Sequence, residues 1–146
     1  MSDAAPDPEA LATLHATSFD RGWSATTFAD LLKQPGVLAI TGSDGFILFR
    51  VVADEAEILT LAVRPEGRGR GQGGRLTREA AAAAAEAGAR RLFLEVAEDN
   101  VAARALYRRA GFEVFGGRPR YYARPGATPV DALLLSLNLP GPLPIG

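Results

Sequence analysis

The residues best suited to chemistry in this chain are a glycine- and arginine-rich loop, a lone carboxylate and a tyrosine. The loop runs from Arg64 to Gly74 and alternates glycine with arginine between a strand-like and a helix-like segment. Glycine has no Cβ, so successive amides can turn inward around an anion, and a helix N-terminus adds partial positive charge. The pattern predicts a phosphate-binding loop formed by Arg68, Gly69, Arg70, Gly71, Gln72, Gly73 and Gly74.

Three kinds of phosphate-binding motif compete for this loop. Residues 69–74 satisfy G-x-G-x-x-G, and an acid follows about twenty residues later, as in a dinucleotide-binding fold. However, Arg64–Arg68 separate the strand from the first glycine, and too few βα repeats remain for such a domain. A Walker loop requires a lysine here, and the only lysine is Lys33. The third motif, [Q/R]-x-x-G-x-[G/A], is a pyrophosphate cradle that opens a helix and fits residues 68–73.

The carboxylate is Glu95, within the apolar segment Leu92–Val96. Alternation places Leu92, Leu94 and Val96 on one face of a strand, and Phe93 and Glu95 on the other. A charged group on a covered face is costly unless it is paired, hydrated or functional. Glu95 is therefore either a general base or a carboxylate at the open end of its strand, paired with an arginine. Glu57, on the preceding strand, is a second candidate base, although it begins that strand in a cluster of solvated acids.

The tyrosine is Tyr107, seven residues after Asn100. Asn100 is a good N-cap for a helix, and Ala103 and Tyr107 follow it on roughly the same face. The small Ala103 leaves room for a ligand on this face. A tyrosine hydroxyl can protonate a departing thiolate, but a single tyrosine beside Leu106 is also typical of a helix packed on a core.

Composition narrows the chemistry further. The chain has 146 residues, 47% of them hydrophobic, and this suffices for one domain with a core. It has no cysteine and one histidine, His15, so thiolate sites, multi-histidine metal sites and serine–histidine relays are not expected. No metal site is expected at all. Residues 1–63 are net acidic and residues 64–124 net basic, which suits a polyanionic ligand on the basic half. We expect no nucleic-acid or membrane partner and a cytoplasmic protein.

The hydrophobic pattern predicts a mixed α/β fold. Helices are expected at Pro8–Phe19, Ser24–Lys33, Arg75–Ala87 and Asn100–Arg109, and strands at Val37–Thr41, Phe46–Ala53, Glu57–Val63, Leu92–Val96, Phe112–Phe115 and Val130–Leu137. A polar loop separates the last two strands, and residues 138–146 form a proline-rich tail after a domain of residues 1–137. Only the β–α–β unit around the glycine loop requires parallel strands, so the sheet should be mixed.

These motifs together resemble the GNAT acetyltransferase superfamily. The loop at residues 68–73, Leu94-Glu95-Val96, and the run Asn100-x-x-Ala103-x-x-Leu106-Tyr107 followed by Gly111-Phe112 match its signatures. More narrowly, the sequence is similar to the ribosomal-protein-alanine N-acetyltransferase (RimI) family, with which it shares segments over roughly residues 10–137. The resemblance implies a single GNAT domain, with a central mixed twisted sheet, a β–α–β core for acetyl-CoA and flanking helices.

The resemblance also implies a reaction and its residues. Acetyl-CoA would be the co-substrate, its pyrophosphate held by the loop amides, its pantetheine arm paired along Leu61, Ala62 and Val63 and bonded to Asn100. An acceptor amine would attack the thioester directly, with Glu95 as base and Tyr107 as acid. Trp23 and Tyr121 are candidates for the acceptor groove.

The acceptor implied by the resemblance is the N-terminal alanine amine of a small-subunit ribosomal protein. Arg120-Tyr121-Tyr122-Ala123-Arg124 departs from that family's Asn-Tyr-Tyr-Pro pattern, and the loop around Asp20–Gly22 differs as well. Two alternatives therefore remain open. One is acetylation of a small-molecule amine, and the other is a non-catalytic acetyl-CoA sensor, in which an intact Glu95 and Tyr107 would be superfluous.

Overall fold

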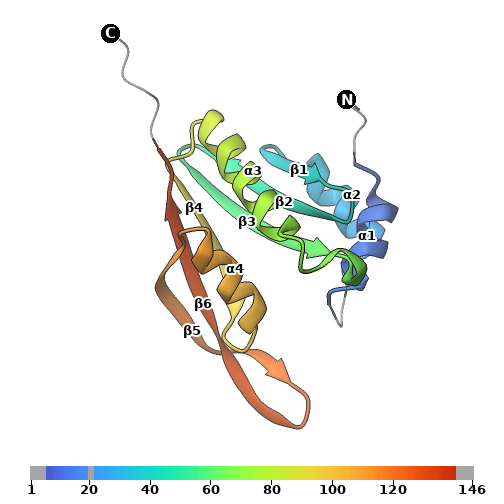
Figure 1. Cartoon of the computed structure of the whole chain (residues 1–146), viewed down its shortest axis with the longest axis vertical. Helices are drawn as coiled ribbons and strands as arrows, with labels where there is room; N and C mark the ends of the chain where they lie inside the picture. The colour runs from blue at the N-terminus through green and yellow to red at the C-terminus, as the bar shows by residue number, and fades with distance from the viewer. Residues whose placement is uncertain (1–5, 20–21, 141–146) are drawn as a thin grey trace.

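The computed structural model describes residues 6–19 and 22–140 as a mixed sheet covered by helices (Figure 1). The elements of this part of the chain are α1 (Pro8–Ala16), α2 (Ala25–Lys33), β1 (Val37–Thr41), β2 (Gly45–Val52), β3 (Glu55–Val63), the short 3-10 helix η1 (Pro65–Gly67), α3 (Gln72–Glu86), β4 (Arg91–Ala97), α4 (Val101–Arg109), β5 (Glu113–Arg124) and β6 (Ala127–Asn138). None of these helices is long and apolar enough to span a membrane.

The six strands form one sheet in the order β1-β2-β3-β4-β6-β5. Every neighbouring pair is antiparallel except β3 and β4, which are parallel and joined by the crossover helix α3. A parallel pair needs such a crossover because its strands start at the same end of the sheet. The mixed sheet expected from the sequence is therefore confirmed.

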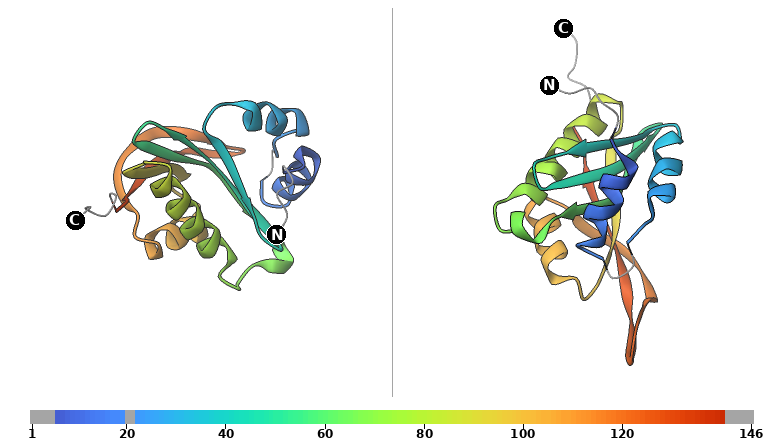
Figure 2. Two further views of the ribbon diagram at one scale, coloured as in Figure 1. Left: turned by 90° about the horizontal axis from the view of Figure 1, so that it is seen from above. Right: turned by 90° about the vertical axis from the view of Figure 1, so that its right-hand side faces the viewer.

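Helices cover both faces of the sheet, as Figure 2 shows in its left view. On one face, α3 and α4 pack through Leu76, Ala80 and Tyr107 onto Leu92 and Leu94 of β4. The alanine run lets α3 lie close to the strands. On the other face, α1 and α2 cover only the β1–β3 end of the sheet, in a second cluster made by Leu11, Phe28, Val37, Phe46, Leu48 and Ala62.

The single histidine lies inside this second cluster. His15 is 2% exposed and its ring stacks between those of Phe19 and Trp23. Its Nδ1 accepts a hydrogen bond from the backbone N–H of Trp23 at 3.2 Å, so Nε2 carries the proton and donates it to Thr60 Oγ1 at 3.1 Å. Burial lowers the pKa of this imidazole to about 4, which keeps it neutral.

Most predicted elements are confirmed with small changes at their ends. Ser24 caps α2 through Thr27 N–H, and Asn100 caps α4 through Ala103 N–H, as expected. The first helix ends at Ala16 and not at Phe19 as predicted. The hydroxyl of Thr17, the residue after this end, donates a hydrogen bond to the Leu14 carbonyl. Helix α3 begins three residues earlier than predicted, at Gln72.

The prediction of a loop between the last two strands is wrong. Strands β5 and β6 continue through it as a long hairpin that projects past the rest of the molecule (Figure 1), and its turn is at Pro125–Gly126. Prolines and glycines are tolerated because β5 is an edge strand, where a missing N–H costs no pairing and bulges absorb irregular backbone. The register is shifted between Val114 and Gly116, and again between Arg118 and Tyr122.

The predicted boundary of the C-terminal tail also needs correction. Asn138 still belongs to β6, where it pairs with Arg91. Leu139 is buried in the core, and its N–H donates to the Arg90 carbonyl at 2.9 Å. The rest of the predicted tail, residues 141–146, lies outside the described residues.

The neutral burial of His15 predicts an acid-sensitive fold. The unfolded chain binds a proton near pH 6.5 and the folded chain only near pH 4, so the free energy of unfolding falls as the pH falls between these values. The loss should reach roughly 3 kcal/mol. Denaturant unfolding of the wild type and of His15→Gln between pH 7 and pH 4 measures it. The variant cannot titrate at this position, so parallel curves for the two proteins would contradict the prediction.

Candidate active site

The site begins where the parallel strands β3 and β4 diverge. Their pairing is limited to Glu55, Ala56 and Glu57 of β3, opposite Arg91, Leu92 and Phe93 of β4. Beyond Glu57, β3 continues to Val63 without pairing with β4, and Figure 1 shows the two strands running apart below α3. The edge of β3 that faces the divergence, along Leu61, Ala62 and Val63, therefore has no partner in β4 and can pair with an extended ligand, except for the Val63 carbonyl, which accepts from Arg68 Nε.

A bulge in β3 lies at the point of divergence. Leu48 of β2 pairs with Thr60 and the next residue, Phe49, pairs with Ile58, so Leu59 is an extra residue in β3. The bulge reverses which side chains face the two helical layers. Ile58 packs with the α3–α4 cluster and Leu59 with the α1–α2 cluster, but Leu61 and Val63 return to the α3–α4 side. Bulges of this kind leave backbone groups unpaired and are common beside active sites.

The glycine loop opens α3 without any side-chain cap. Gly71 is the N-cap with φ of 75°, and Gly69 has φ of 80°, conformations that favour glycine. The first turn of α3 has no acidic residue, and a Cβ at Gly69 or Gly71 would meet nothing within 4 Å. The first amides of α3 have no acceptor within the helix and face no competing carboxylate of their own turn. An uncapped helix N-terminus of this kind is compatible with the phosphate-binding loop that the sequence predicts.

Two of the predicted loop residues use their side chains for other purposes. Arg68 donates from Nε to the Val63 carbonyl at 3.0 Å and from Nη2 to Ser18 Oγ at 3.0 Å, which fixes the loop to the end of β3. The side-chain oxygen of Gln72 accepts from Asp44 N–H at 2.8 Å, in the β1–β2 turn. Both side chains fasten the loop to neighbouring segments of backbone, whereas Arg70 is exposed beside the loop.

Gly73 and Gly74 differ in their surroundings. Gly73 is buried, and a Cβ there would lie 2.6 Å from Leu106 Cδ1 of α4. Gly74 faces outward, and a Cβ there would lie 3.1 Å from Nη1 of Arg78. The glycine at residue 73 thus sets how closely α3 and α4 approach each other.

Glu95 lies on the sheet face opposite α3 and α4, as the alternation of β4 predicted. Its side chain is 28% exposed, and its Oε1 lies 2.5 Å from Nε of Arg118 on β5. The arginine pairing that the sequence left open is therefore present. Glu95 also faces Tyr122, since burial together with the negative charge of Glu95 raises the pKa of the Tyr122 phenol.

Tyr107 lies on the other side of β4, on α4. Its ring packs edge-on against Phe112 at 5.5 Å between centroids, and the residue is 6% exposed. Burial raises the pKa of the phenol well above its usual value, so the hydroxyl keeps its proton. Within the described residues, every fully buried side-chain oxygen has a hydrogen-bond partner. The Tyr107 hydroxyl forms no hydrogen bond with another described residue, so its oxygen is not fully buried and retains contact with solvent. Ala103 lies one turn and Asn100 two turns before it.

The predicted acceptor residues lie in separate parts of the fold. Trp23 packs on His15 and Phe28, so much of its ring serves the core, whereas Tyr121 on β5 is 52% exposed. Glu57, at the last pair between β3 and β4, forms an ion pair with Arg50 of β2, at 3.9 Å between Oε1 and Nη2. Arg118 was not singled out from the sequence, because it stood in a segment predicted to be a loop.

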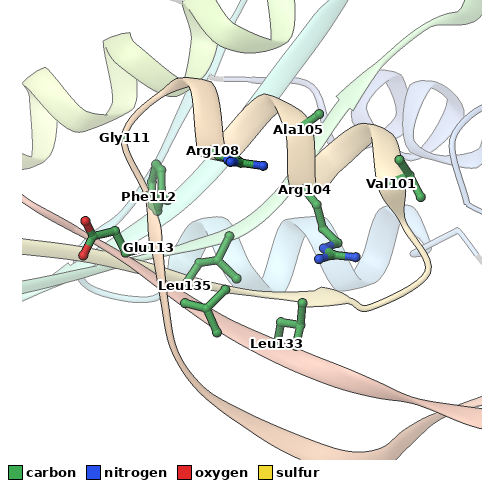
Figure 3. A pocket seen from close by; sticks show the side chains of 10 residues that line it. Val101, Arg104, Ala105, Arg108, Gly111, Phe112, Glu113, Leu133 and Leu135 are labelled. Carbon is green, nitrogen blue, oxygen red and sulfur yellow. The ribbon is translucent and has the colours of Figure 1, made fainter.

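A hollow in the surface lies elsewhere. It has a volume of about 740 Å³ and lies between α4 and the strands β5 and β6, as Figure 3 shows. Apolar side chains such as Leu133 and Leu135 line it, together with Arg104 and Arg108. None of the predicted site residues contributes to it, and it adjoins neither the glycine loop nor the free edge of β3.

The acetyltransferase (GNAT) family pattern matches residues 9–112. This chain belongs to the GNAT acetyltransferase family. A Bacillus subtilis relative with the provisional name ribosomal protein bS18-alanine N-acetyltransferase is 33% identical over 132 residues, 86% of this chain and 85% of that protein.

Solved structures agree with this family assignment. The ribosomal-protein-S18-alanine N-acetyltransferase of Escherichia coli has a TM-score of 0.81 and 28% identity, and the alignment covers 91% of this chain and 88% of that one. The Arabidopsis thaliana protein NAA60, solved in complex with acetyl-CoA, shares the fold with a TM-score of 0.75 at 19% identity, over 90% and 92% of the two chains.

The different surroundings of Gly73 and Gly74 predict opposite effects of alanine. Gly73→Ala should lower the free energy of unfolding by about 1–3 kcal/mol, because the new methyl group forces α3 away from Leu106. Gly74→Ala should leave it unchanged or raise it by up to about 1 kcal/mol, since the end of Arg78 can move and alanine favours a helix. Thermal and denaturant unfolding of the two variants measure both effects. Equal destabilisation would contradict the packing role of Gly73.

Proposed function

We propose that this chain transfers the acetyl group of acetyl-CoA to the N-terminal alanine amine of a protein, a small-subunit ribosomal protein. The observation that carries the proposal is the divergence of β3 and β4 beside an uncapped helix N-terminus, with Glu95 on one side of β4 and Tyr107 on the other. The acceptor follows from the names of the relatives in Bacillus subtilis and Escherichia coli, and such an acceptor implies a cytoplasmic protein.

The residues of this chain fit acetyl-CoA, which supplies the acetyl group as a thioester. The free amides at the start of α3 would bind the pyrophosphate, with Arg70 adding positive charge. The free edge of β3 at Leu61–Val63 would pair with the pantetheine amides as an added strand. Asn100 uses its side-chain oxygen to cap α4, so its amide N–H₂ group remains to donate to the arm.

The two ionisable side chains would divide the proton transfers. An amine attacks only when neutral, and Glu95 would remove its proton, directly or through a water molecule. Tyr107 would donate the proton of its hydroxyl to the departing sulfur. Burial of its ring raises the pKa of the phenol, so the hydroxyl carries the proton when the sulfur departs. Such acid–base assistance contributes about 10²–10⁴-fold, and holding both substrates in line contributes several kcal/mol more.

The acceptor would approach from the face of the sheet that carries Glu95. That face is left open by α1 and α2, which cover only the β1–β3 end, and it is bordered by the β5–β6 hairpin with its exposed Tyr121. In the right view of Figure 2 the hairpin extends beyond the ends of α1 and α2. An acceptor chain lying between α1–α2 and the hairpin would bring its amine to Glu95, opposite the thioester.

The proposal predicts which amine is acetylated and what Tyr107 contributes. A panel of peptides beginning with alanine, serine or methionine, N-blocked lysine peptides and polyamines is incubated with acetyl-CoA and read by mass spectrometry. We expect acetylation of the free N-terminal alanine, and at least a tenfold lower kcat for Tyr107→Phe with an unchanged dissociation constant for acetyl-CoA.

Three other outcomes would change the proposal. Acetylation confined to polyamines or lysine would replace the acceptor and leave the site in place. Tight binding of acetyl-CoA with no acetylated amine would favour a sensor. Full activity of Tyr107→Phe would mean that the hydroxyl takes no part in the reaction.

A further inference from the structure

We propose that Arg118 is a positioning residue for the reaction, which holds one oxygen of Glu95 so that the other faces the acceptor amine. The inference rests on the proposed function, because it assigns Glu95 as the base. It concerns a residue on the β5–β6 hairpin, two residues before the segment Arg120–Arg124 that departs from the pattern of the resembled family.

Arg118 contacts only one of the two carboxylate oxygens of Glu95. Nε of Arg118 lies 2.5 Å from Oε1 of Glu95, and no described residue makes a hydrogen bond to Oε2. Glu95 is 28% exposed and Arg118 is 58% exposed, so the pair lies at the surface where an acceptor can reach it. One carboxylate oxygen is thus anchored and the second is available.

The sheet register brings the two residues together. Arg118 pairs with Ala132 of β6, and Ala132 pairs with Ala97 of β4, so the side chains at residues 118, 132 and 97 share one face. Glu95 lies two residues before Ala97 and therefore on the same face. The guanidinium reaches it across the strand between them.

A bulge in β5, next to Arg118, positions this residue on the strand. Between Arg118 and Tyr122 three residues of β5 face a single residue of β6, and Arg120 has φ of 53°. Asp131 stabilises this backbone, because its Oδ1 accepts from Arg120 N–H at 2.9 Å and its carbonyl accepts from Glu98 N–H at 2.9 Å. The Tyr121 ring, turned outward by this bulge, lies 5.5 Å from the Arg118 guanidinium carbon.

This arrangement affects both partners of the proton transfer. Anchoring Oε1 restricts the rotation of the carboxylate, so the side chain loses less conformational entropy when the reactive complex forms. The positive charge of Arg118 also lies beside the incoming ammonium group. A like charge disfavours the charged form, and therefore favours the neutral amine that can attack.

The kinetic test uses three variants in the full chain. With the amine that the wild type acetylates, we expect Arg118→Ala to lower kcat about tenfold or more while the KM for acetyl-CoA stays within twofold. Arg118→Lys keeps the charge and should recover part of the loss. Arg91→Ala is the matched control, since Arg91 lies on the same face of β4 and stacks on Phe115 at 4.4 Å without touching Glu95. Its kcat should match the wild type.

A spectroscopic test separates this inference from the proposed function. The Nε–Hε signal of Arg118 in ¹⁵N NMR spectra should shift on Glu95→Gln and stay unchanged in Glu57→Gln, whether or not any amine is acetylated. An unchanged signal in Glu95→Gln would overturn the inference even for an active acetyltransferase. A kcat of Arg118→Ala equal to or above that of the wild type would also overturn it, because Arg118 would then be neutral or would obstruct the base. A wild type that acetylates no amine but shows the shift would contradict the proposed function alone.

Discussion

The short parallel pairing of β3 with β4 is the constraint on which the rest of the site depends. Three residue pairs join the strands, and beyond Glu57 the edge of β3 has no partner in β4. A sheet normally satisfies such backbone groups with the next strand. Here the crossover helix α3 starts at the open end of the divergence, so in the proposed function its free amides and the free edge of β3 would serve one extended ligand with an anionic end.

The same constraint explains why the two ionisable residues lie on opposite faces of β4. Leu92, Leu94 and Val96 must face α3 and α4 to complete the core, which turns Glu95 to the other face. Tyr107 lies on the core side, on α4, where its ring is buried and its hydroxyl oxygen is not sealed from solvent. In the proposed function, acceptor and thioester would therefore approach β4 from opposite sides for a direct transfer between two substrates.

The sequence was sufficient wherever local chemistry decides the structure. The caps at Ser24 and Asn100 and the alternation around Glu95 all act within a few residues, and each is found as predicted. The β5–β6 hairpin was missed because its prolines and glycines are typical of a loop, and only its place at the edge of the sheet makes them tolerable. Arg118 was missed with it, since the pairing with Glu95 depends on register across β6. The packing role of Gly73 likewise depends on a contact with the distant Leu106.

The central claim is that acetyl-CoA lies along β3 with its pyrophosphate at the start of α3, and the most direct measurement is an NMR titration of the ¹⁵N-labelled protein with coenzyme A. Our account predicts the largest changes in amide chemical shift at Leu61–Val63 and Gly71–Gly74. Changes confined to Val101, Arg104, Arg108 and Val114, around the hollow beside α4, would contradict it.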